Sequence, residues 1–469
     1  MVTRCLTLVV PESRRGVGEI ILHLPVVIFS PAATLANAPL IEPVVFLNGG
    51  PGGAVFQGAD NGWPLWHANA RRWFDAGARH LVLFTQRGTD NPEAEALACP
   101  AIRDPALAYG ASREPGDASK RQDTARGAIA ACRDRARQAG HDLLAYSTDK
   151  NVNDLRVLLD VLNVRRARLY GVSYGARVAL RFMAAHPNRV SGAILDSPDP
   201  PGHKGVLQVG KNLDHALAAI GALCRRDPAC KRATPDLKTA VEATAGRLAR
   251  DPPKIPVTHP ETGEVWHIRL TPAIFLNTLH LSAYEPRGIA QIPYAVATTQ
   301  NGVYTQISDL VAQALLLDWG VNFGTAASVD CQHFDIEEHR RILREEIAKF
   351  PALTAYLQDL IESNETVCGT WLEGEVFTAE DRPVRPAVPT LILSGALDPV
   401  TPPWIARELA ESLPNALLRT YPDAGHAVLP VNDCAWRDVG RFLKGAGASA
   451  TESCAAADPS VRFALPRFR

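Results

Sequence analysis

The sequence predicts an α/β protein with a mostly parallel, doubly wound sheet and an inserted, mainly helical cap domain. Short, unbroken apolar runs typical of strands buried on both faces occur in the first and last parts of the chain. The long middle part shows helical periodicity instead. Glycine-rich turns directly after two of the apolar runs indicate sharp strand exits.

The 469 residues suit one large α/β domain with a second domain inserted into it. We assign residues 1–200 and 386–469 to the two parts of the sheet domain, and residues 201–385 to the cap. Proline clusters at 198–201 and 383–389 mark the two boundaries.

The charges nearly cancel, with 49 Lys and Arg residues against 50 Asp and Glu residues. This balance gives no support for nucleic acid or an anionic membrane surface as a partner. No apolar run approaches the roughly 20 residues that span a bilayer. We expect a small-molecule or short-peptide substrate and no membrane span; the oligomeric state stays open, and a monomer is compatible with the sequence.

The chain has nine cysteines, and none lies in a C-x-x-C pair, which argues against zinc-ribbon and thioredoxin-like sites. Eight of them have spacings that would close local loops: Cys99 with Cys132, Cys224 with Cys230, Cys331 with Cys368, and Cys434 with Cys454. The pattern favours disulfides and an oxidising compartment over scattered buried thiols. Cys5 is left over, either as a free buried thiol or with a partner outside this sequence.

Residues 14–38 imitate a signal peptide, with an arginine pair, an apolar run and an A-x-A-like site. However, Glu19, His23 and Pro25 interrupt the apolar run, and residues 5–10 are already strand-like. We therefore expect two edge strands joined by a turn near residues 16–18. A leader for export to the periplasm or the medium would have been removed before Met1.

The remaining elements follow from periodicity and breaker residues. Sheet strands are predicted at 43–48, 79–85, 168–172, 190–195, 390–395 and 416–421. Residues 86–147 should form a disulfide-tied excursion at the sheet edge, before a helix over 149–162. The cap, without β alternation from 202 to 385, should contain helices at 207–223, 237–248, 273–281, 307–317 and 336–350. Helices at 403–413 and 434–443 complete the chain.

A Gly-x-Ser-x-Gly motif occupies residues 171–175, between an apolar β run and a helix-prone segment. This order predicts a nucleophile elbow with Ser173 at its tip. The strained turn and the close approach of strand and helix leave no room for Cβ atoms at the two glycines.

The apolar run at 43–48 ends in Asn-Gly-Gly-Pro-Gly-Gly. The segment lacks the lysine of a phosphate-binding P-loop and does not match G-x-G-x-x-G. We expect a backbone N–H of the Gly49–Gly50 turn to form an oxyanion hole with the N–H of Tyr174.

Asp398 and His426 each follow a predicted strand, as Ser173 does. Parallel strands end at a common rim, so the three side chains should converge there in the order Ser–Asp–His, the order of the α/β-hydrolases. Ser173 would attack an acyl carbon, His426 would transfer the proton, and Asp398 would orient the imidazole. Asp196, also at a strand exit, is the alternative acid. A buried Arg87 would brace the loops or, alternatively, touch substrate.

Five motifs together are similar to the exported branch of the proline iminopeptidase and tripeptidyl aminopeptidase family of serine peptidases. They lie at residues 48–52, 86–89, 171–175, 394–402 and 425–426. The resemblance runs from about residue 5 to residue 443 and includes the cysteine placements. It implies an α/β-hydrolase fold, a catalytic triad of Ser173, Asp398 and His426, and cleavage of proline or short peptides from a free N-terminus.

Departures from this family concern the substrate. Thr85 and Asp90 stand where the family usually has Asp and Gly. Relatives that bind a peptide's amino group commonly have Glu two residues after the cysteine equivalent to Cys331, where this chain has His333. Histidine does not offer an ammonium group the acceptor that a carboxylate offers. Other acidic residues could take this place: Glu285, Asp330, Asp335 and Glu373.

The first functional hypothesis is an exported serine aminopeptidase without metal or cofactor. The second is an esterase or amidase for a non-peptide acyl compound on the same scaffold, which His333 allows. The third is a binding protein that has kept the fold without turnover. Aminoacyl anilides separate the first hypothesis from the second, and covalent labelling of Ser173 tests the third.

Overall fold

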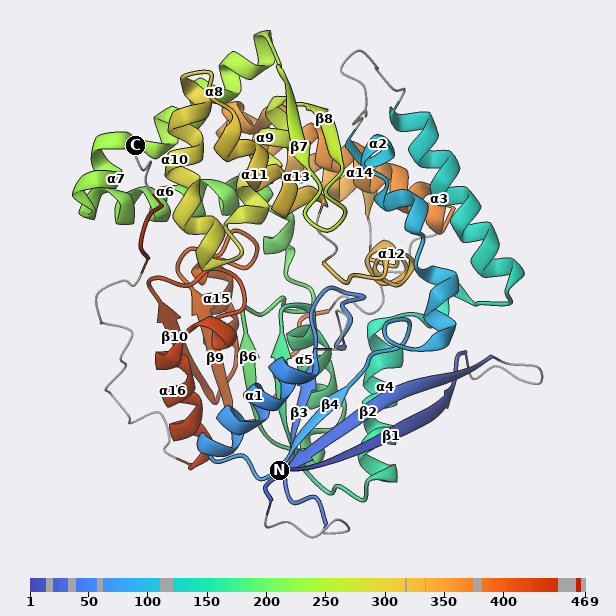
Figure 1. Cartoon of the computed structure of the whole chain (residues 1–469). Helices are drawn as coiled ribbons and strands as arrows, with labels where there is room; N and C mark the ends of the chain where they lie inside the picture. Colours follow the sequence, from blue (N-terminus) through green and yellow to red (C-terminus); the bar gives the residue numbers. More distant parts are fainter. Residues whose placement is uncertain are drawn as a thin grey trace.

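The structure is a computed structural model that describes residues 1–13, 20–32, 39–56, 62–109, 121–316, 319–333, 335–373, 382–445 and 461–464. An eight-stranded sheet lies in the lower half of the molecule in Figure 1, and a largely helical layer covers its upper end. The strands run in the order β1-β2-β4-β3-β5-β6-β9-β10. Their bounds are Val2–Pro11, Ile21–Ser30, Leu81–Phe84, Val44–Leu47, Ala167–Val172, Val190–Asp196, Thr390–Gly395 and Ala416–Tyr421 in that order.

The six strands from β4 to β10 pair in parallel, and β1 and β2 add an antiparallel hairpin at one edge. β3, β4 and β9 are buried along their whole length, as a sheet covered on both faces requires. Helices α4, α5 and α15 pack on one face, and α1 and α16 pack on the other. They span Thr148–Val161, Tyr174–Ala185, Pro403–Ser412, Trp63–Asp75 and Asp433–Leu443. This arrangement is the α/β-hydrolase fold, as predicted.

The cap helices lie between β6 and β9 in the chain. They are α6 Val209–Arg226, α7 Pro228–Ala233, α8 Leu237–Arg250, α9 Pro272–Ser282, α10 Pro286–Gln300, α11 Thr305–Val311, α12 Phe323–Cys331, α13 Ile336–Lys349 and α14 Thr354–Trp371. The expectation that this region has no strands is wrong. β7 Lys254–Thr258 and β8 Val265–Arg269 form an antiparallel hairpin whose inward residues, Ile255, Val257 and Ile268, complete the cap core.

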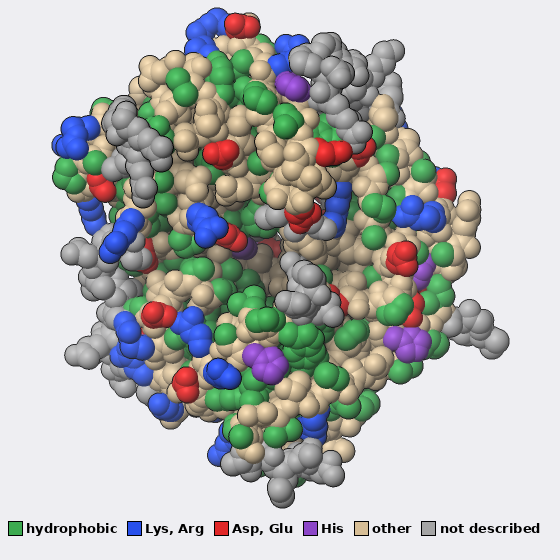
Figure 2. All heavy atoms as spheres, viewed as in Figure 1, with side chains coloured by type: hydrophobic (Ala, Val, Ile, Leu, Met, Phe, Trp, Pro, Cys, Tyr) green, Lys and Arg blue, Asp and Glu red, His purple; other side chains and the backbone are tan. Residues whose placement is uncertain are grey.

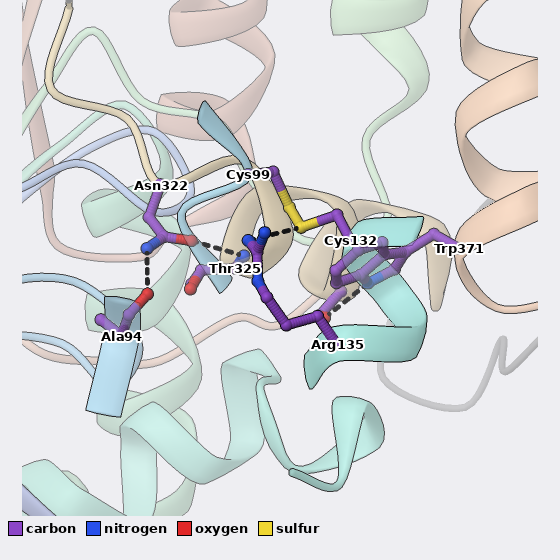
Figure 3. Close-up of a disulfide and its surroundings, with 8 residues drawn as sticks. Ala94, Cys99, Cys132, Arg135, Asn322, Thr325 and Trp371 are labelled. Atoms are coloured by element: carbon purple, nitrogen blue, oxygen red, sulfur yellow. Dashed lines mark hydrogen bonds between the residues drawn. A yellow bond between two sulfur atoms is a disulfide. The ribbon is translucent and has the colours of Figure 1, made fainter. Parts of the chain in front are cut away.

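The excursion after β4 lies partly at the sheet edge, as the sequence suggested, because Glu93 binds His23 of β2 and both His141 and Tyr146 bind Glu12 next to β1. It contains α2 Pro105–Tyr109 and α3 Arg121–Gln138, and it packs against α12 and α14 of the cap (Figure 1). Figure 3 shows the Cys99–Cys132 disulfide beside Trp371 of α14, while Asn322 donates a hydrogen bond to the Ala94 carbonyl at 2.9 Å. The apolar partners of α3 include cap residues that are distant in sequence. Trp371 lies 239 residues after Cys132, so local patterns did not reveal this packing.

Three expected disulfides are present: Cys99–Cys132, Cys224–Cys230 and Cys331–Cys368. Cys434 is also disulfide-bonded, and Cys454, its expected partner, lies outside the described residues. Cys5 is a free thiol but is exposed rather than buried. The three disulfides indicate that the protein folds in an oxidising compartment.

The two N-terminal strands are confirmed as β1 and β2, although the expected turn at 16–18 lies outside the described residues. Ser147 caps α4 by accepting a hydrogen bond from the Lys150 N–H. Within the described ranges, no helix combines the length and the apolar character that crossing a membrane requires.

Candidate active site

Ser173 lies between β5 and α5 with φ 53° and ψ −118°, a backbone conformation that is rare for a residue with a side chain. A Cβ atom at Gly171 would lie 2.5 Å from the Gly175 carbonyl oxygen, and one at Gly175 would lie 2.0 Å from the Leu47 carbonyl oxygen. The two glycines therefore allow strand and helix to meet closely enough for the turn. This geometry matches a nucleophile elbow and holds the serine at the end of β5.

The glycine-rich loop after β3 lies directly against the elbow. A Cβ atom at Gly49 would be 3.3 Å from the Cβ of Ser173. The Gly49 N–H donates to the side-chain oxygen of Asn48 at 2.9 Å, so it does not point freely toward a reacting group. Among the described residues, the N–H groups of Gly50 and Tyr174 have no acceptor, and they remain the available oxyanion donors.

Asp398 and His426 form a hydrogen-bonded pair beyond the ends of β9 and β10. The His426 Nδ1–H donates to Asp398 Oδ2 at 2.9 Å, and the Asp398 side chain is fully buried. The other carboxylate oxygen accepts the N–H groups of Val400 and Thr401 at 2.8 and 2.9 Å, and the Thr401 hydroxyl donates to Oδ2 at 2.8 Å. Because an ionised carboxylate only accepts hydrogen bonds, the imidazole proton lies on Nδ1 and Nε2 is left as a base.

Asp196, the alternative acid, has a different role at the end of β6. Its carboxylate accepts the N–H groups of Val428 and Leu429, both at 2.8 Å, and the hydroxyl of Tyr170 at 3.2 Å. Burial raises the pKa of Asp196 to about 6, although the two N–H donors oppose this effect. Asp196 thus fixes the loop that follows His426 rather than the imidazole itself.

This loop contact connects the histidine to the elbow. Val172 pairs with Asp196 across β5 and β6, and the Ser173 N–H donates to the Asp196 carbonyl at 2.9 Å. Asp196 therefore binds both the Ser173 backbone and the segment that follows His426. No hydrogen bond joins Ser173 Oγ to the His426 ring in the described part of the chain.

The electrostatics of the pair favour the imidazolium that forms when His426 takes up a proton. Burial alone would lower the pKa of His426, but the charge and hydrogen bond of Asp398, together with Asp196 and Asp199, raise it above its ordinary value. Burial raises the pKa of Asp398, and His426 and the N–H donors outweigh that effect, so the carboxyl stays ionised below its usual range. The surroundings thus stabilise a protonated His426, which is what a general base would require.

A cavity of about 400 Å³ lies between the sheet domain and the cap beside the elbow. Figure 2 shows the surface hollowed between these two parts of the molecule. Arg177 and Asp199 line the sheet-domain side and form a two-point ion pair with both N–O distances at 3.1 Å. The Asp199 N–H donates to the Ser173 carbonyl at 3.3 Å, so this wall adjoins the nucleophile.

Asp330 of α12 lines the cap side of this cavity, which is hereafter called the elbow cavity. Asp330 is exposed to this cavity. Desolvation by the surrounding protein nevertheless raises the pKa of Asp330 to about 7. The charge of Arg177 opposes this shift, and the charge of Asp199 adds to it. Asp330 is the acidic side chain that α12 presents to this cavity.

The other four substrate-binding candidates differ in their surroundings. His333 also lines the elbow cavity. Asp335 instead caps α13, where it accepts the N–H groups of Glu337 and Glu338. Glu285 is exposed at the start of α10 and lines none of the cavities described here. Glu373 forms ion pairs with Arg133 and Arg137 of α3. Of the five candidates, the elbow cavity brings together Asp330 and His333.

Arg87 is fully buried and braces the core, since its Nε and Nη2 bind Asp154 at 2.8 and 2.9 Å. Asp90, where the resembling family usually has Gly, accepts the N–H groups of Val55 and Phe56 at 2.6 and 3.1 Å. It therefore holds the end of the glycine-rich loop. Sequence reasoning missed Asp199, although an acidic residue directly after β6 and an arginine in the first turn of α5 could have suggested the pair.

Comparisons with known proteins agree with the fold. A family model described as TAP-like protein matches residues 354–454. A protein of Bacillus subtilis provisionally assigned as a 2-succinyl-6-hydroxy-2,4-cyclohexadiene-1-carboxylate synthase is 40% identical over 55 residues, 12% of this chain. A provisionally assigned non-heme bromoperoxidase of Mycobacterium tuberculosis is 50% identical over 40 residues, 8% of this chain. The matched segments span only 20% and 15% of these relatives' own lengths.

Solved structures align over nearly the whole chain at low identity. The proline iminopeptidase of Mycobacterium smegmatis is 13% identical with a TM-score of 0.40, and the alignment covers 94% of this chain and 98% of that one. A hydrolase from Pseudomonas aeruginosa is 15% identical with a TM-score of 0.37, with coverages of 94% and 98%. The sheet order and the TAP-like match over residues 354–454 agree with an α/β-hydrolase fold.

Proposed function

We propose that this protein is an exported serine hydrolase that releases N-terminal residues from proline-type or short-peptide substrates. The observation that carries the proposal is the Asp398–His426 pair, which leaves Nε2 as a base at the sheet edge where the elbow presents Ser173. The disulfides support export, and Asp330 in the elbow cavity offers a carboxylate for a substrate's ammonium group.

In the proposed reaction, Ser173 Oγ attacks the carbonyl carbon while His426 Nε2 takes its proton. The Ser173–His426 hydrogen bond would form on substrate binding, as catalytic hydrogen bonds are often long without substrate. The N–H groups of Gly50 and Tyr174 would stabilise the oxyanion, and each such donor is typically worth about 2.7–4 kcal/mol. His426 would return the proton to the leaving amine, and water would then hydrolyse the acyl-enzyme by the same route.

A second candidate function is an esterase or amidase for a non-peptide acyl compound. It is favoured by His333, which stands where relatives commonly have an amine-binding glutamate. It is also favoured by the apolar side chains Leu207 and Phe323 in the elbow cavity.

A substrate panel separates the two candidates. Prolyl and alanyl anilides and short peptidyl anilides are assayed beside acyl esters and lactones, with Ser173→Ala as the matched variant. Release of the aniline by the wild-type enzyme, with kcat reduced by at least about 10³-fold in Ser173→Ala, supports the proposal. Ester cleavage without any anilide turnover would favour the second candidate. Turnover that persists in Ser173→Ala would reject both.

A further inference from the structure

A second cavity, of about 320 Å³, lies inside the cap next to the loop that carries Asp398. Leu281 of α9, Leu343 of α13 and Leu360 of α14 line it, and Pro399 and Val400 close it from the sheet domain. We call it the apolar cavity. Its volume lies within the range of ligand pockets, and its lining is mainly hydrophobic with a few polar groups, as such pockets generally are.

The apolar cavity borders the elbow cavity. Leu207, His339 and Asn364 line both, so the two cavities adjoin at these side chains. An acyl group attached at the elbow could therefore place one end near Asp330 and extend its apolar part past these residues.

His280 of α9 is the unusual member of the apolar lining. Its ring is packed near Tyr284 and Tyr356, with centroid distances of 5.9 and 6.0 Å, and the residue is only 8% exposed. Its Nδ1 is buried and has no hydrogen-bond partner among the described residues. A buried polar atom without a partner is costly, so its retention requires an explanation.

The position of His280 relates it to the reaction. Tyr284 lies four residues further along, just after α9. The centroid of its ring is 5.1 Å from the centroid of the His426 ring. One aromatic side chain thus separates His280 from the proposed base. Burial lowers the pKa of His280 to about 4, with His426 adding to this effect and Asp398 opposing it. At neutral pH the ring is uncharged and offers one donor and one acceptor nitrogen.

We propose that His280 is a specificity-determining residue that hydrogen-bonds a polar group on the otherwise apolar acyl part of the substrate. The substrate would belong to a class whose acyl group is mainly apolar. This acyl group would carry a hydroxyl or a peptide group at the point where it passes His280 of α9. The proposal rests on the proposed function, since it assumes acyl transfer to Ser173. It would explain why a neutral imidazole lies unpaired in an apolar wall.

Substrate pairs that differ only by a methyl or a hydroxyl group test this inference. Valyl and threonyl anilides, norvalyl and homoseryl anilides, and para-nitrophenyl heptanoate and ω-hydroxyhexanoate are three such pairs. For each pair, the ratio of kcat/KM for the hydroxyl member to kcat/KM for the methyl member is measured. The enzymes are the wild type, His280→Phe and His280→Gln.

His186→Phe is the matched control, because the His186 ring packs on Phe182 at 5.0 Å near the end of α5 that lies away from Ser173. We expect the ratio to fall about twofold to tenfold in His280→Phe for at least one pair, the size of one lost hydrogen bond. His280→Gln should keep part of the ratio, and His186→Phe should leave it unchanged. Thermal unfolding shows whether each variant is folded. If His280→Phe does not fold, the kcat/KM ratio is compared between the wild type and His280→Gln instead.

Two failures can be told apart. Ratios that stay unchanged in every pair, while a fluorophosphonate still labels Ser173 at the wild-type rate, would overturn the role of His280 alone. A wild-type enzyme that neither turns over any of the six substrates nor becomes labelled at Ser173 would overturn the proposed function and the role of His280 with it.

Discussion

The sheet domain and the cap contribute to the candidate site in different ways. Ser173, Asp398 and His426 each follow a strand, so the hydrogen bonding of the sheet fixes where they lie. Asp330 and His280 lie on cap helices whose positions depend on the packing of side chains distant in sequence. Under the proposed function, the reaction would therefore depend on the sheet, whereas the choice of substrate would depend on the cap.

The two regions meet at the histidine. The His426 N–H donates to the carbonyl of Tyr284, just after α9, at 2.9 Å. A Cβ atom at Gly425 would lie 2.5 Å from the same carbonyl oxygen, so the contact requires a glycine. A change in how the cap packs would therefore reach the proposed base directly.

The largest expected effect comes from the sheet domain. Asp398→Asn should lower kcat/KM by about 10³- to 10⁴-fold for anilides and esters alike, because the amide no longer holds the Nδ1–H tautomer. The acidic limb of the pH–rate profile should also move to lower pH, since the carboxylate that raises the pKa of His426 is lost. Steady-state kinetics across pH measures both effects.

Asp196→Asn is the matched variant at the neighbouring strand end. We expect it to destabilise the fold by about 1–3 kcal/mol through its contacts with Val428 and Leu429, and to lower kcat/KM less than tenfold. Denaturant unfolding measures the stability. If Asp196→Asn impairs turnover as severely as Asp398→Asn, the assignment of the acid is wrong.

A smaller and more selective effect is expected in the cap. Asp330→Asn should lower kcat/KM about tenfold to hundredfold for substrates with a free amino group, because a charge-assisted hydrogen bond is lost. Uncharged esters should be cleaved almost normally. In the wild type, KM for the anilide should decrease as pH rises through about 7, where Asp330 becomes ionised, until the substrate amine loses its own proton.

This pH dependence of KM should disappear in Asp330→Asn. Asp335→Asn is the control, because Asp335 caps α13 and should affect stability rather than KM. Equal losses on esters and anilides in Asp330→Asn would remove the distinction between a catalytic sheet and a selective cap.

The elbow and the strand ends that carry Ser173, Asp398 and His426 could be predicted because each depends on a short local pattern: a Gly-x-Ser-x-Gly turn, or a polar residue after an apolar run. The disulfides followed from spacing, and three are present. The β7–β8 hairpin and the packing of α3 on α14 were missed, because their partners are set by tertiary contacts. His280 carried no signal in the sequence, since only the fold reveals that its Nδ1 is buried and unpaired.

The most direct test of the central claim is the rate at which a fluorophosphonate labels Ser173, followed by mass spectrometry in the wild type and in His426→Ala. If the serine and the Asp398–His426 pair act together, the reagent should modify Ser173 stoichiometrically, and the rate should fall by at least about 10³-fold without the imidazole. Labelling of another residue, or an equal rate in His426→Ala, would contradict the account.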